Sequence, residues 1–338
     1  MKKIKIAING FGRIGRLVLR AIYESHHENI EVVAVNDLTD VKTNAHLFKY
    51  DSVHGCFAGT VDHDQENLII KGQKIQVFSE MNPENIPWKK LGVQVVMECS
   101  GKFTDREKAE LHLKAGAEKV LISAPAKGED KTIVYGVNHH TLTAKDRIVS
   151  NASCTTNCLA PVAFILDREF GIEKGYMTTI HSYTGDQRLI DTAHQDLRRA
   201  RAAALSMIPT STGAAKALGL VLPHLKGKLD GTAIRVPTSN VSIVDLTFVS
   251  SRPTTAEEIN KAMEKAARSE LKGILDAVNL PLVSIDFNHN AHSSNFDLTQ
   301  TAVVDGNFCR ILSWYDNEWG FSNRMLDTAL IMARLTHG

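Results

Sequence analysis

Residues 5–16 read KIAINGFGRIGR and decide the fold of the first half of the chain. A short apolar run typical of a buried strand precedes the glycines, and an apolar helical run follows them. Gly10 permits a tight turn, Gly12 lets a diphosphate approach the backbone, and Gly15 lets the helix pack closely on the strand. The segment therefore predicts a strand, a phosphate-binding loop and a helix, rather than a generic strand–turn–helix.

A second apolar strand pattern at 32–35 ends in Asn36 and Asp37. Asp37 lies about twenty residues beyond the last glycine, where a carboxylate can bind the hydroxyls of an adenosine ribose. The same carboxylate would repel a 2′-phosphate, so the pattern favours NAD over NADP.

Three further apolar strand patterns follow, at 95–99, 119–123 and 132–136. Strands that alternate with helices predict a parallel, doubly wound sheet with its ligand at the carboxyl ends of the strands. Ser100, Gly101 and Ser123 stand at such ends. Each is a candidate contact for nicotinamide, although each fits an ordinary strand-end turn equally well.

Composition and charge narrow the class of protein. The 338 residues carry a formal net charge of +1 and are 43% hydrophobic, which gives no reason to expect a nucleic-acid or membrane partner. No apolar run has the length of a membrane span, and the N-terminus lacks the pattern of a signal peptide. Five cysteines at irregular spacings predict reduced thiols in a cytoplasmic protein and no metal site.

Residues 150–158 read SNASCTTNC and follow a strand-like run. An apolar, helix-like run follows them, so Cys154 is expected near a helix start with Asn151 or Ser153 as the cap. The helix dipole and the unpaired N–H groups favour a nucleophilic thiolate and create an anion site. The alternative is a small buried cysteine that packs as a hydrophobe.

The second half reads as a mixed or antiparallel sheet with helices. Strands are expected at 245–249, at 282–287 and around the hairpin Asp305-Gly306, and an amphipathic helix is expected at 255–268 with Thr254 or Thr255 as its cap. Alternating residues predict a strand that carries His181 to its end. A structural role for this histidine, one of 14, is the alternative.

Several residues of the second half suit an anion. The segment 196–203 is basic and helix-compatible, and fits a solvated face as well as it fits an anion site. Thr212 and Gly213 stand before a predicted helix and offer a hydroxyl and backbone N–H groups to a phosphate. Arg235 lies in an apolar strand, where a charge needs either an anionic ligand or an interior carboxylate.

The nonapeptide at 150–158 closely resembles the active-site signature of phosphorylating glyceraldehyde-3-phosphate dehydrogenases, and HSYTGDQ at 181–187 resembles the family segment that holds the catalytic histidine. The resemblance covers essentially the whole chain. It implies a Rossmann NAD-binding domain at 1–153, an α+β catalytic domain with a mixed or antiparallel sheet at 154–318, and a C-terminal helix at 319–338 that packs back on the first domain.

The resemblance also implies residue roles. Cys154 and His181 would be catalytic. NAD would be bound by Gly10, Arg13, Ile14, Asp37, Met81, Ser123 and Asn317. The substrate phosphate would be held by Thr184 and Arg235, and inorganic phosphate by Ser153, Thr155, Arg199, Thr212 and Gly213.

Two of the implied cofactor contacts carry an alternative. The family often reads Glu-Arg-Asp-Pro where this chain has Glu80-Met81-Asn82-Pro83, so only the backbone of Met81 is expected at adenine. Asn317 also suits a helix cap, and both roles are compatible.

The implied protein is a cytoplasmic homotetramer of glycolysis that converts D-glyceraldehyde 3-phosphate, NAD and inorganic phosphate to 1,3-bisphosphoglycerate through a cysteine thioester. It needs no metal, membrane or nucleic acid. An erythrose-4-phosphate dehydrogenase is the nearest alternative enzyme, and an NAD-binding redox sensor or scaffold is the alternative of another class. Residues 191–194 lack the Leu-Pro pair of many strictly NAD-using relatives, which leaves NADP use open.

Overall fold

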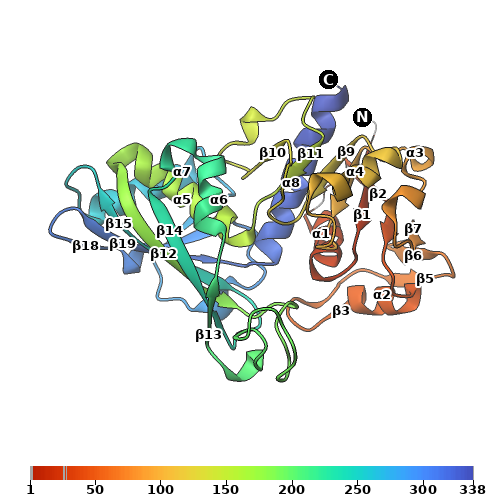
Figure 1. The fold of residues 1–338 in the computed structure, drawn as a ribbon, viewed down its shortest axis with the longest axis horizontal. Coiled ribbons are helices and arrows are strands. Elements are labelled where there is room, and N and C mark those ends of the chain that lie inside the picture. The colour runs from red at the N-terminus through yellow and green to blue at the C-terminus, as the bar shows by residue number, and fades with distance from the viewer. Residues whose placement is uncertain (1–2, 26, 28, 338) are drawn as a thin grey trace. The chain divides into compact units, whose positions relative to one another are not determined.

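A computed structural model describes residues 3–25, 27 and 29–337 (Figure 1). The chain divides into two compact units. Unit 1 comprises residues up to Ile133, His139–Ala152 and the residues from Ser322 onward, and unit 2 comprises Val134–Asn138 and Ser153–Phe321.

Unit 1 is built on a mainly parallel sheet. Its strands are β1 (Ile4–Asn9), β2 (Ile30–Asn36), β5 (Val61–His63), β6 (Asn67–Ile70), β7 (Gln73–Phe78), β8 (Val95–Glu98), β9 (Lys119–Ile122), β10 (Lys131–Thr132) and β11 (Ile148–Ser150). Within the described residues they run in the order β10-β11-β9-β8-β1-β2-β7-β6-β5. Neighbouring strands along β10-β11-β9-β8-β1-β2-β7 are parallel, whereas β6 and β5 continue the sheet with antiparallel pairing.

Helices connect the parallel strands. They are α1 (Arg13–Glu24), α2 (Val41–Lys49), α3 (Trp88–Leu91) and α4 (Arg106–Lys114). The unit 1 part of α8 (Trp319–His337) follows unit 2 in the chain, and the short strands β3 (Tyr50–Asp51) and β4 (Gly55–Cys56) form a separate ribbon. Because the chain leaves β1 for β2 on one side and later returns to β8 on the other, the strand order reverses at β1. The carboxyl ends of β1 and β8 therefore form the topological switch point where such sheets bind ligands.

Unit 2 contains a mixed sheet whose central strands are long. Its strands are β12 (Ile172–Ser182), β13 (Ile208–Ser211), β14 (Leu229–Val236), β15 (Ser242–Ser250), β16 (Leu275–Val278), β17 (Ser294–Asp297), β18 (Ala302–Val304) and β19 (Phe308–Tyr315). The main path is β13-β14-β12-β15-β19-β17-β16, with β18 paired to β19, and Figure 1 shows its central strands side by side. The helices are α5 (Cys154–Phe170), α6 (Ala214–Val221) and α7 (Ala256–Arg268).

The predicted α/β fold with a parallel first sheet and a mixed second sheet is confirmed. Local signals account for several element ends. Thr255 caps α7 in a capping box with Glu258. Asp305 and Gly306 take positive φ angles of 54° and 75° in the hairpin that joins β18 to β19.

Three local predictions are wrong or too long. A strand was expected at 282–287, but Ser284–Phe287 forms a 3-10 helix whose first N–H, from Val283, donates to the Asp286 carboxylate. The helix-compatible segment 196–203 forms mainly turns, because the Asp196 carboxylate accepts from Arg198 N and the Asp191 carboxylate accepts from Ala202 N. The strand expected at 132–136 ends at Thr132.

The helices carry no membrane signature. Across residues 3–25, 27 and 29–337, each helix is either too short or too polar to cross a bilayer.

Candidate active site

The predicted phosphate-binding loop of unit 1 is set by close backbone contacts. Gly10 has a φ of +88°, and a Cβ there would lie 2.5 Å from the Ser100 backbone. A Cβ at Gly15 would lie 2.1 Å from the Gly10 carbonyl oxygen, so α1 packs directly on the loop. Among the described residues, nothing lies within 4 Å of the position of a Cβ at Gly12. The first N–H groups of α1 therefore face open space that a diphosphate can enter.

Asp37 closes the other side of this loop. Its carboxylate accepts hydrogen bonds from Phe11 N at 2.7 Å and Thr39 N at 2.9 Å. Each oxygen keeps a further lone pair for a ribose hydroxyl. A cavity of about 350 Å³ joins these elements, lined by Asn9, Gly10, Gly12, Asn36, Asp37, Leu38, Glu80, Met81, Cys99, Ser100, Lys102 and Phe103.

The composition of this cavity tests the predicted cofactor. An open glycine loop, a helix N-terminus and a ribose-binding carboxylate together match an adenine dinucleotide without a 2′-phosphate. Met81 is 78% exposed beside the cavity, which leaves its backbone as the fixed part. Arg13 and Ile14 do not line this cavity; the Arg13 guanidinium forms an ion pair with Asp51 at 2.6 Å. Ser123 lies at the end of β9.

Sequence reasoning missed a buried polar network beneath the cavity. Asn9 Nδ2 and His112 Nε2 donate to the Glu98 carboxylate at 2.5 and 3.1 Å, and Asn36 Nδ2 donates to Asn9 Oδ1 at 2.7 Å. The Ser100 backbone N–H donates to the same carboxylate at 2.7 Å. The available signal was that Asn9, Asn36 and Glu98 each end an otherwise apolar strand.

Cys154 lies where the sequence places it. It is the first residue of α5, Ser153 is the N-cap, and the Ser153 hydroxyl accepts from Thr156 N at 3.1 Å. Ala152, just before the cap, has a φ of 57°, which is uncommon for a residue with a Cβ. This turn points the Cys154 side chain and the first N–H groups of α5 out of the helix end.

His181 is brought to Cys154 from the end of β12. Its Nε2 lies 3.5 Å from Cys154 Sγ. Its Nδ1 lies 2.7 Å from the Ser182 carbonyl oxygen. In the tautomer that carries the proton on Nδ1, the Nε2 lone pair faces the thiol. The Tyr315 ring packs edge-on against the imidazole at 5.9 Å, and Tyr315 Oη bonds Thr155 and Thr179 at 2.8 and 2.9 Å.

Burial and neighbouring charge shift the pKa values of this pair. Burial raises the pKa of the Cys154 thiol, and the positive charge of Arg235 opposes that rise. Burial, followed by the Arg235 charge, lowers the pKa of His181 to about 3. Burial therefore opposes the thiolate that the sequence suggested, whereas the Arg235 charge and the N–H groups at the helix start favour it.

Arg235 is the nearest cation to the pair. Its Nη1 lies 2.9 Å from His181 Nδ1 and donates to the Ser182 carbonyl at 2.9 Å and the Thr184 hydroxyl at 3.5 Å. Its Nε is buried without a hydrogen-bond partner, and no described carboxylate lies within ion-pair distance of it. The alternative of an interior salt bridge is therefore not found, and the guanidinium is available to an anion.

Several residues predicted to bind inorganic phosphate already bond to other protein groups. Asp186 and Asp196 hold the Arg199 guanidinium at 2.7 and 3.8 Å. Its charge still lowers the pKa of His181, behind the larger effects of burial and Arg235. Gly213 is the N-cap of α6, and the Thr212 hydroxyl accepts from Ala214 N at 3.2 Å. The Thr155 hydroxyl bonds Tyr315 in a position 4% exposed, so only its N–H faces the helix end.

Asn317 is held by two hydroxyls. Ser182 Oγ and Ser242 Oγ donate to Asn317 Oδ1 at 2.8 and 2.9 Å, which orients its amide nitrogen as the remaining donor. The cap of α8 is instead Asp316, whose carboxylate accepts from Glu318 N at 2.9 Å and Trp319 N at 2.7 Å. The alternative role for Asn317 therefore belongs to its neighbour.

Comparison with known proteins assigns both halves of the chain to one family. Residues 4–106 match the family described as "Glyceraldehyde 3-phosphate dehydrogenase, NAD binding domain", and residues 153–317 match "Glyceraldehyde 3-phosphate dehydrogenase, C-terminal domain". The chain belongs to the glyceraldehyde-3-phosphate dehydrogenase family. The predicted NAD cofactor and oxidoreductase class are confirmed at the level of this family.

Relatives that carry the family name align over nearly the whole chain. The glyceraldehyde-3-phosphate dehydrogenase of Xanthobacter flavus is 63% identical over 332 residues, which cover 98% of this chain and 99% of the relative. That of Cereibacter sphaeroides is also 63% identical, with the same coverage. That of Geobacillus stearothermophilus is 56% identical over 98% of both chains.

Proposed function

We propose that this chain oxidises D-glyceraldehyde 3-phosphate with NAD and inorganic phosphate, and releases 1,3-bisphosphoglycerate and NADH. The observation that carries the proposal is the 3.5 Å approach of Cys154 Sγ to His181 Nε2 with the unpaired Arg235 beside them. Family membership supports the substrate and the cofactor.

The reaction begins with transfer of the Cys154 thiol proton to His181 Nε2. The thiolate then attacks the aldehyde carbon, and the oxyanion that forms is stabilised by the Cys154 backbone N–H and the imidazolium. Substrate binding assists this step, because a phosphate on Arg235 cancels a charge that otherwise lowers the pKa of His181.

Oxidation and acyl transfer follow on the same sulfur. Bound NAD supplies the hydride acceptor. His181 Nε2 first returns its proton to the oxyanion, which becomes the hydroxyl of the hemithioacetal. It takes that proton back as the hydride leaves, and a Cys154 thioester remains. A phosphate oxygen then attacks the thioester carbon, and the Cys154 thiolate leaves as the acyl phosphate forms.

The residue roles are part of this proposal. Thr184 and Arg235 hold the substrate phosphate. Inorganic phosphate is held by Ser153, Thr155, Arg199, Thr212 and Gly213. NAD is held by Gly10, Arg13, Ile14, Asp37, Met81, Ser123 and Asn317. Support comes from the glycine loop with Asp37, and from the free guanidinium of Arg235.

We also propose that the enzyme is a cytoplasmic homotetramer with functional boundaries at 1–153, 154–318 and 319–338. The division of the chain near 152 and again near 321 supports these boundaries. Light scattering in solution should give about four times the chain mass of 37.2 kDa. A monomer or dimer at assay concentration would contradict the tetramer.

One assay separates the candidate activities. NADH absorbance is followed with D-glyceraldehyde 3-phosphate or erythrose 4-phosphate, each with and without inorganic phosphate. We expect the triose phosphate to give the higher kcat/KM and multiple turnovers only when phosphate is present. Preference for erythrose 4-phosphate would favour the related dehydrogenase. NAD binding and Cys154 oxidation without NADH formation would favour a redox sensor.

A further inference from the structure

Unit 1 has two adjoining hollows that the proposed reaction does not use. The larger, of about 540 Å³, is lined by Ala117, Glu118 and Lys119 at the start of β9, with Lys89, Lys114 and Arg147 around them. The start of β9 lies at the amino ends of the parallel strands, whereas the dinucleotide cavity lies at their carboxyl ends. The smaller hollow, of about 390 Å³, shares Leu113, Lys114 and Arg147 with it.

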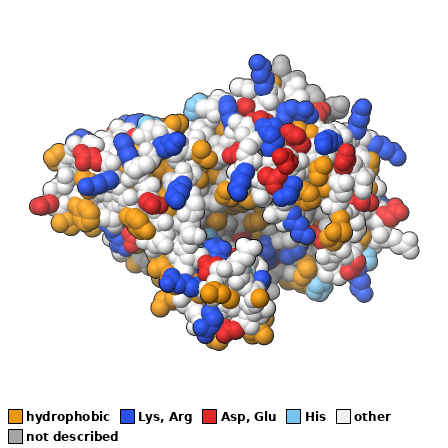
Figure 2. Space-filling view, in the orientation of Figure 1, with side chains coloured by type: hydrophobic (Ala, Val, Ile, Leu, Met, Phe, Trp, Pro, Cys, Tyr) orange, Lys and Arg blue, Asp and Glu red, His pale blue; other side chains and the backbone are white. Residues whose placement is uncertain are grey.

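Positive charge dominates both hollows in the part of the chain that the structure describes. Six lysine or arginine side chains line them, against three carboxylates. Figure 2 shows lysine and arginine side chains gathered, with a few carboxylates, over the region where Figure 1 labels α4. Two of the carboxylates are already engaged, because Glu110 and Asp130 both bond the Arg106 guanidinium.

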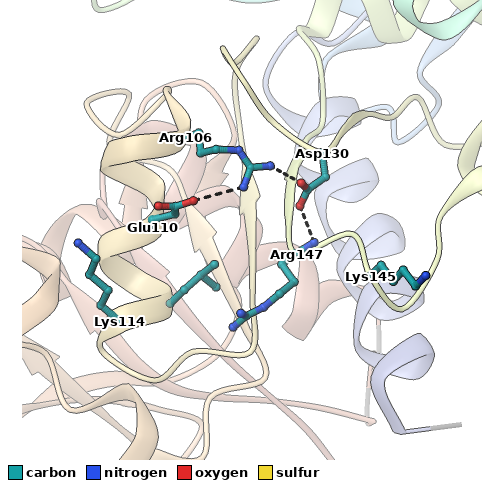
Figure 3. Close-up of a pocket in the computed structure, with 7 residues that line it drawn as sticks. Arg106, Glu110, Lys114, Asp130, Lys145 and Arg147 are labelled. Carbon is teal, nitrogen blue, oxygen red and sulfur yellow. Dashed lines mark hydrogen bonds and ion pairs between the residues drawn. The ribbon is translucent and has the colours of Figure 1, made fainter.

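Arg147 lines both hollows and is held in place, and Figure 3 shows it in the smaller hollow. Its backbone N–H donates to the Asp130 carboxylate at 2.8 Å, and its side-chain Nε donates to the Glu118 carbonyl at 3.1 Å. No described carboxylate pairs with its guanidinium, nor with the ammonium groups of Lys114 and Lys145. A guanidinium whose position is fixed but whose charge is unpaired suits a planar anion such as phosphate.

Lys119 is the unusual member of this group. It is only 2% exposed, and its Nζ is buried without a hydrogen-bond partner among the described residues. A buried, unpaired ammonium costs free energy of folding, and lysine is almost never buried in this way without a partner. Burial lowers its pKa, although the nearby Asp146 and Glu118 carboxylates oppose that effect.

We propose that these hollows form a second anion site of unit 1, which binds a small molecule with two or more phosphate groups. Lys119 lines the larger hollow and adds buried positive charge beneath it, and Arg147 and Lys114 line both hollows. The volumes match those of small-molecule sites rather than an extended macromolecular surface. This inference does not depend on the proposed function, because the hollows lie at the end of the sheet away from the dinucleotide cavity.

Inorganic tripolyphosphate is a suitable probe, and calorimetry on the NAD-saturated full-length protein measures its affinity and stoichiometry. The test variants are Lys119→Met and Arg147→Gln, and the control is Lys265→Gln, which removes an exposed lysine of α7 in unit 2. We expect each test variant to weaken tripolyphosphate binding at this site by about tenfold or more, since each removes a positive charge that attracts the anion. The control should bind as the parent does, and kcat and KM should be unchanged in all three variants.

Thermal unfolding gives a second readout. If Lys119 only stabilised the fold, the variant Lys119→Met would have a lower Tm than the parent. Removal of an unpaired buried charge should raise the Tm of Lys119→Met without ligand by about 2–4 °C. Tripolyphosphate should then raise the Tm of this variant less than it raises that of the parent.

The proposal is overturned if both test variants bind tripolyphosphate as tightly as the parent, or if Lys119→Met is destabilised with its affinity unchanged. Equal weakening by the Lys265→Gln control would reveal non-specific charge attraction, which also overturns it. Loss of oligonucleotide binding in Arg147→Gln, without any change for tripolyphosphate, would replace the small ligand by a nucleic acid.

Discussion

The phosphate-binding loop of unit 1 and the Cys154–His181 pair of unit 2 are assembled in different ways. The loop is one short segment, in which Gly10 and Gly15 contact each other through backbone atoms. The pair joins residues 27 positions apart, and Arg235 is added from 54 positions beyond His181. The geometry of the loop therefore depends on the small size of its glycines. The geometry of the Cys154–His181 pair depends instead on strand register and burial.

Replacement of the nucleophile should have the largest effect. Cys154→Ser should lower phosphate-dependent NADH formation by about 10⁴-fold or more, because a serine hydroxyl at this position is a far weaker nucleophile. NAD affinity, measured by calorimetry, should stay near that of the parent. Cys158→Ala is the matched control, since Cys158 lies on the same helix but is buried against Ser294 and Ser313. Equal losses in the two variants would contradict a special role for Cys154.

Loss of the general base should be the next largest effect. His181→Gln should lower kcat by about 10²–10⁴-fold with a smaller change in KM, because the ring acts on protons rather than on substrate binding. The exposed His224, which pairs with Asp167 at 2.8 Å, provides the control His224→Gln. Steady-state kinetics that leave His181→Gln within tenfold of the parent would exclude the proposed base.

Two glycine variants separate steric fit from ligand access in the loop. Gly10→Ala places a Cβ 2.5 Å from the Ser100 backbone at a φ of +88°, so it should lower the free energy of unfolding by about 1–3 kcal/mol and weaken NAD binding. Gly12→Ala meets open space among the described residues, so it should weaken NAD binding with little change in Tm. Calorimetry and thermal unfolding check both, and equal Tm losses would contradict the distinction.

Burial of His181 predicts a pH dependence of stability. Its pKa is lowered from 6.5 to about 3 in the folded state, so the unfolded chain binds the proton more readily between these values. Its contribution to stability should therefore be lost as the pH falls from about 6.5 toward 3. Denaturant unfolding at several pH values should show a shallower loss in His181→Gln than in the parent. Parallel curves would show that the imidazole is not held neutral.

The smallest effect is expected at the ribose carboxylate. Asp37→Ser should lower the ratio of the KM for NADP to the KM for NAD by about tenfold, because a negative charge no longer faces the 2′-phosphate. The parent itself should prefer NAD. Steady-state kinetics with both cofactors check this, and an unchanged ratio would show that discrimination lies elsewhere.

Sequence patterns predicted the elements that local chemistry specifies. The Ser153 cap before Cys154, the Thr255 capping box and the Asp305-Gly306 hairpin each depend on residues within a few positions of one another. The prediction for 282–287 failed because its alternating apolar residues resemble a strand, while the bond between Val283 N–H and Asp286 favours a 3-10 turn. Competition between side chain and backbone is not visible in periodicity alone.

The sequence by itself determined the nucleotide-binding architecture, because glycines, strand ends and a carboxylate at set spacings leave the backbone few other arrangements. It also determined that Cys154 begins a helix. Only the tertiary structure brought His181 within 3.5 Å of Cys154, left Arg235 without a carboxylate and buried Lys119 without a partner. It also set burial, which raises the pKa of the thiol, against the helix start and Arg235, because pKa values depend on burial and on neighbours distant in the chain.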